Sequence, residues 1–155
     1  MDKEQIKNIL PKIGSEEEIK LKQISPRVVM NEFEEAIKES YPNYLSAFTT
    51  ETTRIEQNGI EVLSYSFYLI AFIGKGYTYK LFELVPKKAD APYPVHLILF
   101  QNFPHNEGEI NSQEMLQDKL LAVFKSGFTQ NIIKNLIAQV ELYNESRSDE
   151  IQEVL

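Results

Sequence analysis

The stretch LSYSFYLIAFIGKGYTYKLFELV, residues 63–85, decides the fold of this chain. Two long apolar runs flank Gly74-Lys75-Gly76, and both are rich in the aromatic and branched residues that favour β-strands. The two glycines predict a short turn between the runs. The stretch therefore predicts an antiparallel β-hairpin that marks the core of the protein.

Strand pairing divides this hairpin into two faces. A turn at residues 74–76 would place Ile73 opposite Tyr77 and Phe67 opposite Glu83. Because side chains alternate along a strand, one face would then be largely apolar and is expected to meet the helices. Its members would be Tyr65, Phe67, Leu69, Ala71, Ile73, Tyr77, Tyr79, Leu81, Glu83 and Val85.

The opposite face of the hairpin is the unusual one. It begins polar, at Ser64 and Ser66, and then turns apolar. The apolar residues expected there are Tyr68, Ile70, Phe72, Phe82 and Leu84. An antiparallel sheet with one solvated side should be polar on that side. The sequence therefore predicts a cover for this second face, and three covers remain open: the protein's own helices, a second subunit or protein partner, or a ligand.

The segments around the hairpin predict one α+β domain over residues 1–146, with a frayed tail at 147–155. About four mainly antiparallel strands are expected, at 44–57, 60–73, 77–85 and 95–100. Asn58-Gly59 between the first two is typical of a type I′ turn. Apolar periodicity and capping residues predict an N-terminal helix at 26–40 and two C-terminal helices at 112–126 and 130–145.

Several segments are less clear. Asp2 could cap a short N-terminal helix that Pro11 ends, and residues 16–22 alternate in a way that suits either an edge strand or a charged linker. Residues 101–111 are polar and predict a loop. The run VHLILF at 95–100 lacks alternation, which predicts a strand buried on both faces. The three prolines between 86 and 94 predict a loop where the strand order could jump.

Composition narrows the class of protein. A chain of 155 residues is the size of one domain. The net charge of −7 is spread along the chain and argues against nucleic acid and anionic membranes as partners. The longest apolar run, residues 67–73, is far shorter than the about 18 residues of a membrane span. The chain has no cysteine, which fits a reducing compartment, so we expect a cytoplasmic protein.

Residues with catalytic or metal-binding chemistry do not converge in the sequence. His105 lies in a loop near Glu107 and Glu109 and is a weak candidate metal ligand. His96 lies within a predicted strand and suits a core histidine. Glu83 either reaches water near a sheet edge or is buried with a partner. We predict no catalytic residues and no cofactor, and an enzyme is the least favoured class.

Two functions follow from these observations. The first is a non-catalytic protein-binding module of the small acidic chaperone, inhibitor, immunity or adaptor type. It would bind a protein partner, or a second copy, through Tyr68, Ile70, Phe72, Phe82 and Leu84. The alternative is a small-molecule binding protein with a pocket between sheet and helices. Its lining residues would be Tyr65, Tyr77, Tyr79 and Glu83.

Overall fold

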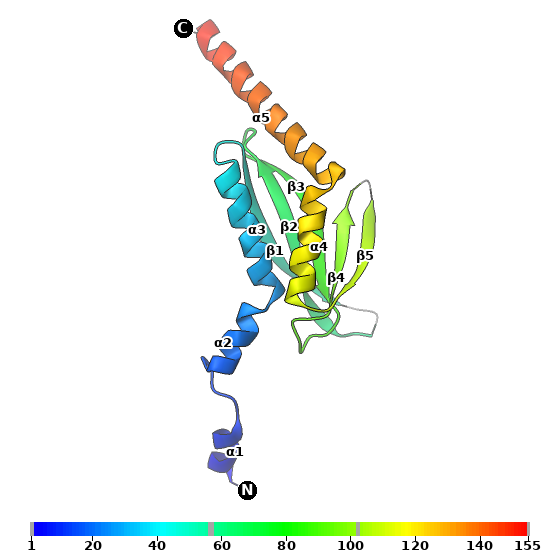
Figure 1. The fold of residues 1–155 in the computed structure, drawn as a ribbon. Helices are drawn as coiled ribbons and strands as arrows, with labels where there is room; N and C mark the ends of the chain where they lie inside the picture. Colours follow the sequence, from blue (N-terminus) through cyan, green and yellow to red (C-terminus); the bar gives the residue numbers. More distant parts are fainter. Residues whose placement is uncertain (1, 56–57, 102, 155) are drawn as a thin grey trace.

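The computed structural model describes residues 2–55, 58–101 and 103–154, with side chains up to residue 148. The fold is α+β, as predicted: N-terminal helices precede an antiparallel sheet, and two helices follow it (Figure 1). The helices are α1 (Lys3–Ile9), α2 (Glu16–Gln23), α3 (Pro26–Ser40), α4 (Gln113–Lys125) and α5 (Gly127–Val154). The strands are β1 (Leu45–Ile55), β2 (Glu61–Ala71), β3 (Tyr77–Pro86), β4 (Val95–Phe100) and β5 (Pro104–Ile110).

The sheet is a simple meander. Its five strands lie in the order β1-β2-β3-β4-β5, and every neighbouring pair is antiparallel. The proline-rich loop after β3 therefore joins adjacent strands and makes no jump in strand order. Helices α3 and α4 pack against one face of this sheet (Figure 1).

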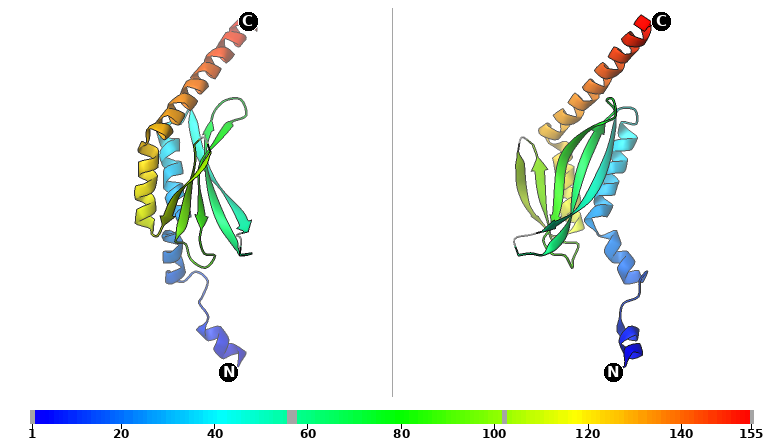
Figure 2. Two further views of the ribbon diagram at one scale, coloured as in Figure 1. Left: turned by 90° about the vertical axis from the view of Figure 1, so that its right-hand side faces the viewer. Right: turned by 180° about the vertical axis from the view of Figure 1, so that it is seen from behind.

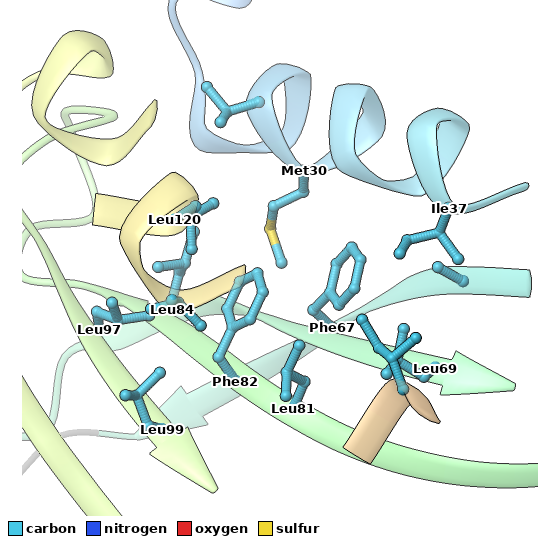
Figure 3. Packing of buried hydrophobic residues seen from close by; sticks show 14 of the residues in the cluster. Met30, Ile37, Phe67, Leu69, Leu81, Phe82, Leu84, Leu97, Leu99 and Leu120 are labelled. Carbon is cyan, nitrogen blue, oxygen red and sulfur yellow. The ribbon is translucent and has the colours of Figure 1, made fainter. Parts of the chain in front are cut away.

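The core lies between that face and the two helices. Met30 of α3 and Leu120 of α4 reach toward Phe67 and Phe82 of the central strands (Figure 3). The two phenylalanine rings stack with centroids 4.9 Å apart, and Phe124 of α4 meets both edge-on. Side chains of this size each gain about 1.5–3 kcal/mol from burial, so this layer stabilises the packing of both helices on the sheet.

The β2–β3 hairpin pairs differently from the prediction. Ala71 lies opposite Tyr77, so the connecting loop is residues 72–76. The register then shifts between Phe67 and Tyr68: Tyr68 lies opposite Lys80, whereas Phe67 lies opposite Phe82. Leu81 is the extra residue, which makes this irregularity a β-bulge.

The bulge reverses the faces of the second half of β3. One extra residue moves every following side chain to the other side of the sheet. Phe82 and Leu84 therefore point into the core, where both are 0% exposed, and Glu83 and Val85 point away from the helices. The predicted faces of these four residues were wrong.

A fifth strand occupies part of the segment that was predicted to be a loop. β5 pairs with β4, with Ile110 opposite Val95. Its sequence PHNEGEI hides the strand because it is an edge strand whose side chains are mostly exposed and polar. Proline is tolerated at the start of an edge strand, and Gly108, with φ of +104°, follows a register shift in this ladder.

The first hairpin also differs in its turn. Ile55 pairs with Glu61, and between them the structure describes residues 58–60; positions 56–57 lie outside the described residues. Gly59 has a φ of +80°, but the described Asn58 does not have a positive φ, so the predicted type I′ turn is wrong. The side-chain oxygen of Asn58 instead accepts a hydrogen bond from the amide of Ile60 at 3.1 Å.

The described N-terminal residues 2–24 contain helices and no strand. In α2, the Ser15 hydroxyl accepts the amide of Glu18, which caps the helix. Three glutamates occupy its first turn and two lysines its last, an arrangement that the helix dipole favours over a strand. Neither α1 nor α2 contains a buried residue.

The helix prediction at 26–40 is confirmed by α3, and α4 lies within the predicted 112–126. α5 begins at Gly127, three residues before the predicted start, because only the extended Ser126 separates it from α4. It continues to Val154, through the segment that we expected to be frayed. Among the described side chains of α5, the last buried one is Val140, and the second half of the helix projects past the sheet (Figure 1).

Candidate functional site

The face of the sheet opposite α3 and α4 has no helix packed on it in the described structure (Figure 2). Three covers for this face were considered above. The described helices do not provide the first of them, because they all lie elsewhere. We use the name open face for the half-buried large side chains on this side of the sheet. They are Phe48, Tyr68, Ile70, Lys80, Ile98 and Phe100.

An aromatic row crosses the open face from β1 to β4. The rings of Phe48 and Tyr68 stack with centroids 4.9 Å apart and an interplanar angle of 9°. Tyr68 pairs with Lys80 across β2 and β3. The Lys80 Nζ lies 4.2 Å from the centroid of the Phe100 ring, which is cation–π geometry. The row thus consists of three rings and one cation, and the cation lies over the ring of Phe100.

Glu83 forms the charged centre on the same side of the sheet. Its carboxylate accepts a hydrogen bond from Arg54 Nη1 at 3.2 Å and another from Lys80 Nζ at 3.0 Å. Glu83 is only 8% exposed, and both longer side chains contact its carboxylate. Of the two alternatives for Glu83, the structure shows a buried carboxylate with partners.

This ion cluster borders a shallow hollow of about 430 Å³. Hydroxyl groups line one side of it, where Thr52 and Ser64 share a hydrogen bond of 2.9 Å. Ile98 and Phe100 line the other side. This side of the sheet thus combines aromatic rings, hydroxyl groups and an ion cluster of two cations and one carboxylate.

The predicted binding face is only partly on this side of the sheet. Tyr68 and Ile70 belong to the open face, and Phe72 lies just beyond the end of β2 with 40% of its surface exposed. Phe82 and Leu84 are instead buried in the core, because the bulge at Leu81 turns them to the helix side of the sheet.

Sequence reasoning placed Lys80 on the same face as Tyr68 and Ile70, but it missed Phe48, Ile98 and Phe100 as their neighbours. Phe48 could have been found from the alternation of β1. Ile98 and Phe100 were hidden because VHLILF was expected to be buried on both sides, whereas only Val95, Leu97 and Leu99 are buried.

The four residues of the predicted tyrosine pocket do not meet. Tyr77 and Tyr79 line a hollow of about 390 Å³ beside Ile132 and Leu136 of α5. Tyr65 lines a separate hollow of about 320 Å³ next to the loop after β3, and Glu83 lies on the other side of the sheet.

Two half-buried tyrosines of the predicted pocket, Tyr65 and Tyr79, have raised pKa values. Burial raises the pKa of Tyr79, and the neighbouring Tyr77 adds to the effect. The Tyr79 hydroxyl donates to the Phe100 carbonyl at 3.1 Å. Burial also raises the pKa of Tyr65, with a further rise from Glu51 and an opposing effect of Arg27. Both hydroxyl groups therefore ionise at a higher pH than an exposed tyrosine does.

Neither histidine lies in a metal site among the described residues. His96 is half-buried on the side of the open face, opposite Glu109, and not in the core as predicted. Its Nδ1 is buried without a hydrogen-bond partner in the described part of the chain. His105 is exposed, with Nε2 3.5 Å from a Glu107 oxygen. The described residues contain no group of three His, Asp or Glu side chains close enough to hold a metal ion.

Comparisons of the chain with protein-family models, with curated proteins and with solved structures give no match. Among the described helices, none combines the length and the apolar character needed to cross a membrane.

Proposed function

We propose that this protein is a non-catalytic protein-binding module of the small acidic chaperone, inhibitor or adaptor kind, and that it binds its partner through the open face. The observation that carries the proposal is the aromatic row Phe48–Tyr68–Lys80–Phe100, which no described helix covers. A sheet face that met only water would be polar. Aromatic residues are instead enriched in the cores of protein interfaces.

The ion cluster supports this proposal by holding the row in place. Glu83 binds both Arg54 and Lys80, so the lysine ammonium is fixed over Phe100 before any partner arrives. A surface that is ordered in advance loses less conformational entropy on binding. The cluster also offers the partner charged groups at fixed positions beside the aromatic rings.

The test is capture of partner proteins by the purified, immobilised chain from an extract of its source cells. The variant Phe48→Ser/Tyr68→Ser breaks the aromatic stack and should lose captured proteins at least tenfold, because buried aromatic residues dominate interface energies. The control Leu142→Ser removes an exposed apolar side chain from α5, away from the sheet, and should capture as the parent does.

Circular dichroism and thermal melting would show that both variants are folded. Equal capture by the open-face variant and by the parent would contradict the proposal, as would an absence of any protein retained above the background of the resin.

A further inference from the structure

The N-terminal segment, residues 2–24, has the features of a docking element, and we call it the arm. None of its side chains is buried, yet it carries seven large apolar residues that are each at least 41% exposed. They are Ile6, Ile9, Leu10, Ile13, Ile19, Leu21 and Ile24. Such a concentration of exposed apolar side chains outside the core marks a surface that binds another.

The helices of the arm also need support. α1 has seven residues and α2 has eight. Isolated helices shorter than about 12–15 residues are marginal in water, and most helical stability in proteins comes from packing of an apolar face. In the monomer the arm contacts the rest of the domain weakly, for instance through a 3.3 Å hydrogen bond from the Gln113 amide to the Gln23 carbonyl.

We propose that the arm docks on the open face of a second copy of the chain, so that two copies exchange arms in a closed dimer. The inference rests on the proposed function, because it names the partner of the same face. Each monomer carries both surfaces uncovered, and a reciprocal exchange covers both at once. Such two-fold exchange closes on itself and does not propagate into a fibre.

Charge favours this occupant. The arm contains five basic and five acidic residues, so the net charge of −7 belongs to the rest of the chain. Two acidic bodies that met directly would repel each other. A neutral arm lying between them provides contact without that repulsion.

Size agrees as well. The 23 residues of the arm, together with the open face that receives the partner's arm, are enough to supply the about 20–30 residues a side of a standard interface. The apolar residues of the arm would face the Phe48–Tyr68 stack and Ile70, where rings and branched side chains present matching chemistry.

The arm is poorly placed to cover the open face of its own chain. α2 and α3 are separated only by Ile24 and Ser25, and α3 packs on the opposite side of the sheet. The linker of six residues between α1 and α2 spans at most about 20 Å. Both views show the arm directed away from the sheet (Figures 1 and 2).

The experiment locates the arm by photo-crosslinking in the full-length chain. A photoreactive side chain replaces Ile9 in a chain labelled with ¹⁵N, which is mixed with unlabelled chain before illumination. Mass spectrometry of the linked peptides then separates links within one chain from links between two. The expected product joins the labelled arm to unlabelled peptides from β1 or β2. The same photoreactive group at Leu142 is the matched control and should give no such product.

Light scattering supplies the second readout. The parent should have twice the monomer mass, and Ile6→Ser/Ile9→Ser should return it to the monomer mass. These positions are exposed, so the variant should still fold. A parent that remains monomeric, or links from position 9 that map elsewhere, would overturn the inference.

The two proposals can fail separately. If the parent is monomeric and Phe48→Ser/Tyr68→Ser still captures fewer partner proteins, the arm exchange is wrong and the proposal of a protein-binding face stands. Arm exchange with no captured foreign protein would show that the second copy is the occupant of the face. If the parent is monomeric and captures no partner, both the arm exchange and the protein-binding function are contradicted.

Discussion

At the scale of single residues, the loop before β4 holds an unusual hydroxyl group. Tyr93 is half-buried, and its hydroxyl has no hydrogen-bond partner among the described residues. Burial raises the pKa of Tyr93 to about 12, from an ordinary value of 10.0. A buried hydroxyl without a partner costs about 1–3 kcal/mol relative to one exposed to water.

This environment predicts how stability responds to alkaline pH. In the unfolded chain Tyr93 ionises near its ordinary pKa, whereas in the folded protein it stays protonated up to about pH 12. The free energy of unfolding should therefore be unaffected by this group below about pH 10 and should fall between about pH 10 and 12.

The variant Tyr93→Phe removes the ionisable group and should lose its part of this decline. At neutral pH it should be more stable than the parent by about 1 kcal/mol, since the unpaired hydroxyl is gone. Urea denaturation at neutral and alkaline pH measures both effects. Parallel curves for the parent and the variant across the alkaline range would contradict the prediction.

At the scale of elements, the bulge in β3 decides which residues the hairpin shows to a partner. Before it, Lys80 shares the open face with Tyr68; after it, Phe82 lies in the core and Glu83 takes the open side. The bulge thus places a lysine and a glutamate three residues apart on the same side, where they pair at 3.0 Å. Without the extra residue, regular alternation would put them on opposite faces.

Truncation of two phenylalanines tests this arrangement. Phe82→Ala should cost about 3–5 kcal/mol of stability, because it empties a fully buried site. Phe48→Ala on the open face should cost about 1 kcal/mol, the scale of a partly exposed aromatic pair. Chemical denaturation measures both values. Equal costs would mean that Phe82 is not buried on the helix side and that the bulge is absent.

At the scale of the whole molecule, stability should be uneven across the sheet. β2 and β3 lie between other strands and under the helices, whereas β5 is an edge strand with mostly exposed side chains. Local opening costs little where few apolar contacts are broken.

Hydrogen exchange measured by NMR should therefore show the slowest amides in β2 and β3. The amides of β5 that pair with β4 should exchange at least tenfold faster, since β5 can detach without opening the core. The amides of α3 and α4, the helices that pack on the sheet, serve as an internal reference. Protection in β5 equal to that in β3 would contradict this view of the domain.

Local signals in the sequence determined much of the secondary structure. Ser25-Pro26 and apolar residues at four-residue spacing are enough to define α3, and the β-rich runs define β2, β3 and β4. These signals work because helix capping and hydrophobic periodicity act between residues close in the chain. The α+β class follows from the order of those elements.

Only the tertiary structure decided the surfaces. The bulge at Leu81 depends on how β3 pairs with β2, and β5 exists as a strand because β4 offers it a partner. The sequence showed that the Leu63–Val85 hairpin carries more apolar residues than one buried face requires. Which of them lie in the core and which form the open face depends on pairing between strands, and a shift of a single residue reverses every side chain.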